Sequence, residues 1–176
     1  AASPAVLSVT AIDAKSRQGG FPDQSESIDF AAPGVAILTA AEEGKTQLFT
    51  GTSAATPFVT GTLASLLSRD PLQSTDQIVS ELRQSLNESG ALGPDPIYGG
   101  GWVDWERLSD TGESERVDIA LADIHLPTDA LPGTNVPVEI IIQNRGNQWH
   151  PGGELAIQVS DGSELQSFQL RSTQPG

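Results

Sequence analysis

The amino-acid sequence predicts an α/β domain over residues 1–112, followed by an all-β domain over residues 113–176. Two observations lead to this prediction. In the first part, short β-branched segments precede two stretches whose apolar residues recur every three or four positions, the spacing of an amphipathic helix. After about residue 112 this spacing disappears, and four strand-like runs separated by turns follow, which is typical of an antiparallel sandwich.

In the first part, residues 5–13 are rich in β-branched residues and predict a strand, and residues 15–26 have the composition of a loop. Residues 27–40 give two short apolar segments on either side of Pro33-Gly34, and residues 43–45 predict a turn. A helix is expected from Ser53 to about Arg69, because the dipeptide Asp70-Pro71 cannot continue it.

A second helix is expected to begin at Ser74, because Gln77 stands three residues later in the pattern of a capping box. Its expected buried stripe consists of Ile78, Val79, Leu82 and Leu86.

In the second part, the four expected strands cover residues 117–126, 136–144, 154–161 and 165–171, and residues 109–115 form the expected linker. Residues 113–176 number 64, whereas an immunoglobulin-like domain has about 100 residues. We therefore expect the sandwich to be incomplete.

The charge and composition exclude several classes of function. The chain has 9 basic and 23 acidic residues, a net charge of −14, and a surface this acidic repels nucleic acid and anionic lipid. It has no cysteine, which excludes disulfides, thiolate catalysis and cysteine-based zinc sites. No apolar run approaches the length of a membrane span. The sequence does not begin with Met, and we expect it to be a piece of a longer protein.

Residues 51–57, GTSAATP, suit a nucleophilic serine. Gly51 allows close approach of a second backbone, and Ser53 falls at the first turn of an apolar helix, where backbone N–H groups are unpaired and the helix dipole is positive. Such a position stabilises an oxyanion. The structural alternative is that Ser53 is only the N-cap of the helix, since serine is among the best capping residues.

Residues 51–61, GTSAATPFVTG, resemble the serine motif of the subtilisin-like peptidases, Gly-Thr-Ser-x-Ala-x-Pro-x-Val-x-Gly. Three flanking segments are also similar to segments of that family: residues 1–13, 28–37 and 98–105. Because the four segments occur in the family's order, residues 1–112 are identified as the C-terminal portion of a subtilisin-like peptidase domain. The resemblance implies a doubly wound parallel sheet.

The resemblance also implies roles for two residues. Ser53 would be the nucleophile and its backbone N–H an oxyanion donor, while Thr52 would support the oxyanion hole. In this family the catalytic chain order is Asp, His, Ser. The base and the oxyanion asparagine are therefore expected before Ala1, and His125 and His150 are expected to be surface residues of the sandwich.

The function implied is that of a serine endopeptidase fragment, which hydrolyses peptide bonds through an acyl-enzyme only when the upstream Asp, His and Asn are present. Its partners would be a peptide or protein substrate and the upstream segment of the same peptidase, with an extracellular or cell-surface, bacterial-type location. The alternative is a non-catalytic subtilase-derived module for binding or adhesion.

No cofactor is required for this chemistry, although subtilases often hold structural calcium. Four carboxylates lie near one another in the sequence and could hold calcium, an oxygen-seeking ion: Asp13, Asp23, Glu26 and Asp29. They lack the spacing of a recognisable calcium loop, and solvated surface carboxylates are the alternative.

Residues 115–147 resemble the opening of CARDB-type domains, immunoglobulin-like modules named for bacterial adhesion. The similar features are the Val-Asp-Ile-Ala run from Val117, the turn at Pro132-Gly133 and the pattern that ends at Gly146. Nothing in these residues names a ligand.

Overall fold

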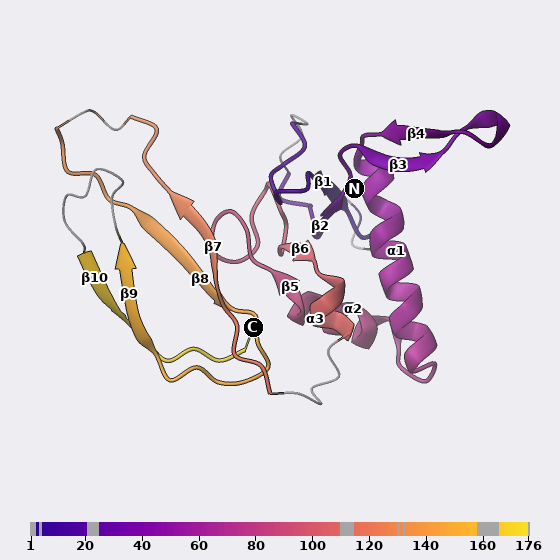
Figure 1. The fold of residues 1–176 in the computed structure, drawn as a ribbon. Coiled ribbons are helices and arrows are strands. Elements are labelled where there is room, and N and C mark those ends of the chain that lie inside the picture. Colours follow the sequence, from indigo (N-terminus) through magenta and orange to yellow (C-terminus); the bar gives the residue numbers. More distant parts are fainter. Residues whose placement is uncertain are drawn as a thin grey trace.

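The structure is a computed structural model that describes residues 3, 5–20, 25–109, 115–129, 131, 133–157 and 166–175. Helices pack on a small sheet in the first part of the chain, and two β-hairpins follow on its other side (Figure 1). The expected succession of an α/β part and an all-β part is therefore present.

The central sheet has four strands in the order β1 (Val9–Ile12), β2 (Phe30–Pro33), β6 (Trp102–Val103) and β5 (Leu86–Asn87). β1 and β6 both run parallel to β2, whereas β5 runs antiparallel to β6. The apolar segments expected at residues 5–13 and 27–33 supply β1 and β2. In the described residues the sheet is thus mixed, and the doubly wound arrangement stays a prediction.

Helix α1 (Thr52–Arg69) lies along β1 and β2, as expected from its apolar spacing. It ends at Arg69, and its C-cap is Asp70, the residue before Pro71. The main core lies between the helices and the sheet and consists of these buried residues: Ala11, Phe30, Ala32, Ala55, Val59, Leu66, Ile78, Leu82, Leu86, Val103 and Leu108.

Helix α2 (Thr75–Gln84) begins with the expected capping box. The Ser74 hydroxyl accepts the Gln77 N–H at 3.3 Å, and the Gln77 side chain accepts the Ser74 N–H at 2.8 Å. The expectation for Leu86 is wrong: the helix ends at Gln84, and Leu86 pairs with Val103 in the sheet. The Ser85 hydroxyl donates to the Leu82 carbonyl at 2.9 Å and so provides a hydrogen bond to one of the last carbonyl groups of α2. The chain then continues into β5.

Strands β3 (Ile37–Ala40) and β4 (Thr46–Phe49) form an antiparallel hairpin that projects beyond the sheet (Figure 1). The expected turn is a short 3₁₀ segment, η1 (Glu42–Gly44). Leu38 and Leu48 face each other across the hairpin and are each 68% exposed. The hairpin joins the end of β2 to the start of α1.

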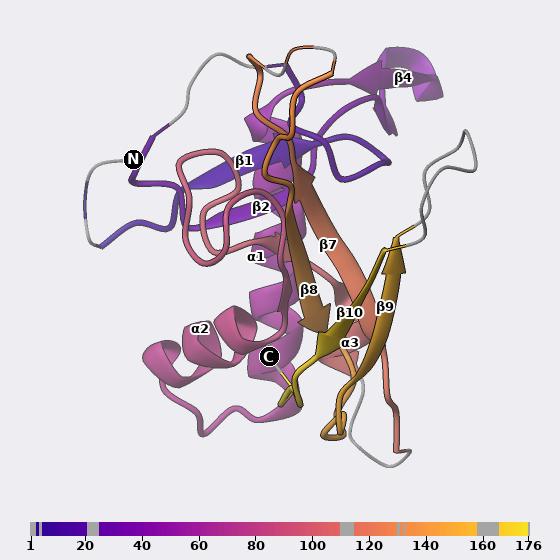
Figure 2. The ribbon, with the colours of Figure 1, turned by 90° about the vertical axis from the view of Figure 1, so that its left-hand side faces the viewer.

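Each of the four strand-like runs contains a strand, and residues 158–161 and 165 of the expected runs lie outside the described residues. β7 (Ile119–His125) pairs with β8 (Glu139–Asn144), and β9 (Gly153–Ile157) pairs with β10 (Gln166–Leu170), both antiparallel. Figure 2 shows the two hairpins side by side, and apolar side chains of β8, β9 and β10 line a cavity of about 490 Å³. Within the described residues they form two separate two-stranded sheets, so the immunoglobulin-like sandwich stays a prediction.

A short helix, α3 (Trp105–Ser109), connects β6 to the expected linker, of which residues 110–114 lie outside the described residues. Among the helices that the structure describes, none combines the length and hydropathy needed to cross a lipid bilayer.

Candidate functional site

Ser53 is the second residue of α1, and its side chain is exposed. The N-cap is Gly51, whose carbonyl accepts the N–H groups of Ala54 at 2.9 Å and Ala55 at 3.3 Å. The N-cap interpretation of Ser53 is therefore wrong. In the described part of the chain, neither the Ser53 hydroxyl nor the N–H groups of Thr52 and Ser53 have a hydrogen-bond partner.

The turn at Pro33-Gly34 fixes the start of α1. Gly34 donates its N–H to the Ile12 carbonyl at 3.0 Å and accepts the Gly51 N–H at 2.8 Å. A Cβ at Gly34 would lie 2.5 Å from the Ala11 Cβ and 2.8 Å from the Gly51 oxygen, distances that real Cβ atoms do not reach. Only glycine lets the three segments approach so closely. Ser53 therefore lies just beyond the carboxyl ends of the parallel strands β1 and β2, where α/β sheets bind ligands.

The backbone around Ser53 is rigid for further reasons. Ala54 and Ala55 are buried against the core, and the Thr50 hydroxyl accepts the Ala36 N–H at 2.8 Å. Pro57 lies within the first turns, where its missing N–H leaves the Ser53 carbonyl without the usual helical donor. The result is a fixed serine with an exposed hydroxyl at the positive end of an 18-residue helix. Such an arrangement suits nucleophilic attack with stabilisation of an oxyanion.

Thr52 is the first residue of α1, and its side chain is exposed beside Ser53. Its carbonyl accepts the Thr56 hydroxyl at 2.9 Å, which strengthens the first turn next to Pro57. The structure therefore places both of the predicted site residues, Ser53 and Thr52, on one exposed helix turn.

The two histidines are engaged in the second part of the chain. His125 Nε2 lies 2.8 Å from the Gly90 carbonyl, in the loop after β5, and is half-buried. His150 Nδ1 accepts the Gly152 N–H at 3.1 Å, and its backbone pairs with Thr173. His125 is thus a junction residue and not the surface residue expected, because β7 packs against that loop. Neither ring is bonded to Ser53.

Of the four carboxylates considered for calcium, Asp13 and Asp29 each form an ion pair with a different arginine. Asp13 binds Arg17 at 2.7 Å, and the hydrogen bond from Arg17 lowers the pKa of Asp13 to about 2. Asp29 accepts the Ser8 N–H and binds Arg83 at 2.5 Å, whereas Glu26 is exposed and Asp23 lies outside the described residues. In the described ranges, no three His, Cys, Asp or Glu side chains gather as metal ligands.

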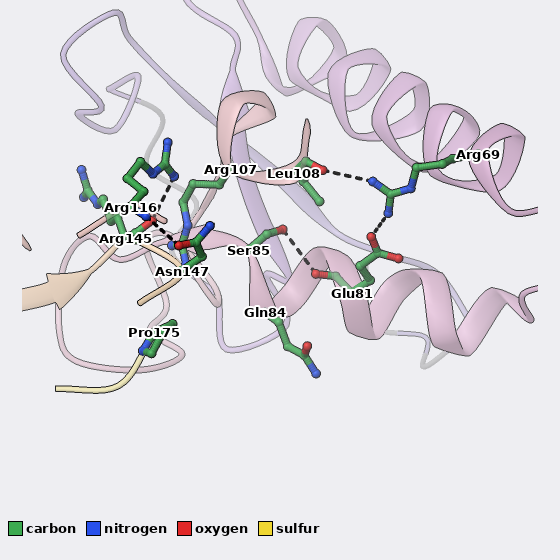
Figure 3. A pocket seen from close by; sticks show the side chains of 11 residues that line it. Arg69, Glu81, Gln84, Ser85, Arg107, Leu108, Arg116, Arg145, Asn147 and Pro175 are labelled. Atoms are coloured by element: carbon green, nitrogen blue, oxygen red, sulfur yellow. Dashed lines mark hydrogen bonds and ion pairs between the residues drawn. The ribbon is translucent and has the colours of Figure 1, made fainter. Parts of the chain in front are cut away.

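A cavity of about 640 Å³ in the described part of the chain lies away from Ser53. It lies by Arg69 at the opposite end of α1, with α2, α3 and the loop after β8 around it (Figure 3). With a rise of 1.5 Å per residue, the two ends of α1 are about 24 Å apart. A search for cavities alone would therefore miss Ser53, which the sequence motif finds.

Comparison with known proteins gives the family. Residues 1–101 match the Subtilase family (Peptidase_S8). The chain belongs to the subtilase family. Over 106 residues it is 29% identical to the minor extracellular protease Epr of Bacillus subtilis, covering 60% of this chain and 16% of Epr. Over 100 residues it is 30% identical to subtilisin E of Bacillus subtilis, covering 57% of this chain and 26% of that relative.

Among solved structures, the patellamide maturation protease PatA matches this subtilase with a TM-score of 0.52 and 29% identity. The match covers 61% of this chain and 43% of PatA. These matches confirm the subtilisin-like nature of the first part of the chain. The chain spans less than half the length of each of these three proteins. The CARDB-type assignment of residues 113–176 and the boundary at residue 112 stay predictions.

Proposed function

We propose that this subtilase supplies the nucleophile of a subtilisin-like serine endopeptidase and acts together with an Asp, a His and an Asn that lie outside its 176 residues. One observation supports this above the others. The Ser53 hydroxyl is exposed on the first turn of α1, beside two backbone N–H groups without acceptors in the described residues, and it performs no capping role.

In the proposed reaction, the histidine takes the proton of the Ser53 hydroxyl while Oγ attacks the substrate carbonyl carbon. The oxyanion that forms accepts a hydrogen bond from the Ser53 N–H and from the asparagine, with Thr52 supporting the hole. The C–N bond breaks, the amine leaves with the proton from the histidine, and water then hydrolyses the acyl-enzyme. Loss of one oxyanion donor typically reduces the rate about 100- to 1000-fold, so the reaction requires the asparagine.

The remaining parts of the proposal concern partners and location. The substrate is a peptide or protein, and the partner is the segment that carries the rest of the catalytic residues. Residues 113–176 form an accessory immunoglobulin-like domain. An extracellular or cell-surface location is supported by the relative Epr, which is named as an extracellular protease.

The test uses the longer polypeptide that includes the residues encoded before Ala1. We expect Ser53→Ala to reduce peptide hydrolysis at least about 10,000-fold and to abolish covalent labelling by a fluorophosphonate. Ser68→Ala is the matched control, because Ser68 is also exposed on α1, and it should change neither readout. The 176-residue chain alone should hydrolyse nothing.

A longer polypeptide that is folded but neither hydrolyses peptides nor labels at Ser53 would contradict the proposal. The non-catalytic binding or adhesion module would then be the better interpretation. Peptide hydrolysis by the isolated chain, lost in Ser53→Ala, would show instead that the machinery is complete within these residues.

A further inference from the structure

Two adjoining cavities lie where α2 and α3 meet the loop after β8, and both include Gln84, Arg107 and Pro175 in their walls. Their volumes are about 640 and 510 Å³, and Figure 3 shows the larger one. We call the two together the arginine groove, because its walls include Arg69, Arg83, Arg107, Arg116 and Arg145. In a chain with only nine Lys and Arg, five of them line this one feature.

Acidic side chains neutralise only part of this charge. Arg69 pairs with Glu81, and Arg83 pairs with Asp29 at 2.5 Å. Within the described residues, Arg107 and Arg145 have no carboxylate within 4.0 Å, the limit for an ion pair. A chain with a net charge of −14 therefore concentrates positive charge in this groove. Glu81 and Glu88 are also in the walls, but the five arginines outnumber these two carboxylates, so the lining has a net positive charge that attracts anions.

Neutral acceptors hold the guanidinium groups in place without cancelling their charge. Arg107 Nη1 donates to the Leu86 carbonyl at 2.6 Å and to Asn87 Oδ1 at 3.3 Å. Arg145 donates from Nε to Gln143 Oε1 at 3.2 Å, and its Cζ lies over the Trp102 ring, 5.8 Å from the ring centroid. Each guanidinium carries five N–H donors, so further donors remain for a ligand.

The surroundings of Arg107 and Arg145 also change their pKa values. Burial lowers the pKa of Arg107, and the nearby charge of Arg145 lowers it further. Burial likewise lowers the pKa of Arg145. The charges of Asp104 and Asp118 act in the opposite direction and raise the pKa of both arginines, which stay charged because a guanidinium is not deprotonated in proteins.

We propose that the arginine groove binds a small molecule that carries two or more oxyanion groups, either carboxylates or phosphates. The planar guanidinium fork matches both groups in bidentate geometry. A single carboxylate would leave most of a 640 Å³ cavity empty, whereas volumes of roughly 300–1,000 Å³ are usual for ligand pockets. The groove is at the other end of α1 from Ser53, so the site is separate from the proposed peptidase centre.

The test is a titration of the 176-residue chain at low ionic strength with citrate and, separately, with tripolyphosphate, followed by calorimetry and by tryptophan fluorescence. We expect saturable 1:1 binding of citrate, of tripolyphosphate or of both. The difference between the two affinities identifies the preferred oxyanion. Arg107→Gln should weaken binding about 10- to 100-fold, since a hydrogen bond to a charged group is lost. Arg107→Lys, which keeps the charge but loses the fork, should be intermediate.

Arg171→Gln is the matched control, because Arg171 is exposed and outside the groove. It should leave the affinity unchanged, and far-UV circular dichroism verifies that each variant is folded. Equal weakening by Arg107→Gln and Arg171→Gln would overturn the proposal in favour of general charge attraction.

Absence of saturable binding would overturn the proposal as well. None of these results depends on hydrolysis by Ser53, so failure here leaves the proposed peptidase function untouched.

Discussion

Gly34 determines the position of Ser53, although it takes no part in the chemistry. Its backbone joins the end of β1 to the N-cap of α1 through hydrogen bonds to Ile12 and Gly51. The space in which a side chain would stand is filled by Ala11, Gly51 and Ala55. In the proposed reaction this rigid placement of Ser53 matters, since small displacements of a reacting group reduce rates strongly.

We therefore expect Gly34→Ala to destabilise the chain by about 1–3 kcal/mol, the usual effect of forcing atoms into a filled core. The matched variant is Gly61→Ala on the exposed side of α1, where a Cβ would have nothing within 4 Å. It should stabilise by about 0.5–1 kcal/mol, because alanine has less freedom to lose on helix formation. Urea unfolding monitored by circular dichroism measures both changes, and a loss in both variants would contradict the packing argument.

The sequence predicted Ser53 and Thr52 because their motif is local: seven residues define the turn, and four segments in order define the family. It did not predict the closeness of Gly34 to Ala11, nor the contact of His125 with Gly90, since both depend on segments more than 20 residues apart. The arginine groove was missed for the same reason. Its five arginines are spread from Arg69 to Arg145, and no short pattern unites them.

At the scale of elements, the end of α1 at Arg69 was predicted correctly, whereas for α2 the start was predicted better than the end. The capping box of α2 is defined by four consecutive residues, so the sequence alone predicts it. Leu86 also continues the helical spacing, but it belongs to β5. Tertiary packing decides there, because Leu86 fills the same core from the sheet that it would have filled from the helix.

The capping box makes a specific prediction for α2. Ser74→Ala removes the acceptor of the Gln77 N–H and should lower the free energy of unfolding by about 1 kcal/mol. Ser80→Ala is the matched control, since Ser80 is exposed in the interior of the same helix, and alanine is the better helix former there. Chemical denaturation of the two variants beside the wild type provides the comparison. Equal stability of Ser74→Ala and the wild type would show that α2 does not depend on its cap.

At the scale of the whole molecule, the change of periodicity near residue 112 predicted the order of the two parts but not how they meet. They meet along residues 86–90 of the first part and strands β7 and β8 of the second. Gly90 donates its N–H to Asp123 at 2.8 Å and contacts His125 through its carbonyl. A periodic pattern in the sequence indicates which face of a strand is apolar. Polar contacts between distant segments produce no such pattern, so the sequence does not predict them.

Gln143 is the centre of this junction, and its removal tests whether the two parts unfold together. Its Nε2 donates to the Leu86 carbonyl at 2.9 Å, and its Oε1 accepts the Glu88 N–H at 2.8 Å. Gln143→Ala leaves the Glu88 N–H without its acceptor, and such an unsatisfied group costs about 1–3 kcal/mol, whereas the Leu86 carbonyl keeps its hydrogen bond from Arg107. Gln169→Ala, at an exposed position of β10, is the matched control and should have little effect.

The measurement is urea unfolding followed by two signals, tryptophan fluorescence and far-UV circular dichroism. In the wild type we expect coincident transitions, because the junction couples the two parts. In Gln143→Ala the transitions should separate, with the β7–β10 hairpins unfolding at the lower urea concentration, since two-stranded sheets are marginal alone. Separate transitions already in the wild type would mean that these hydrogen bonds place the two parts beside each other without making them one cooperative unit.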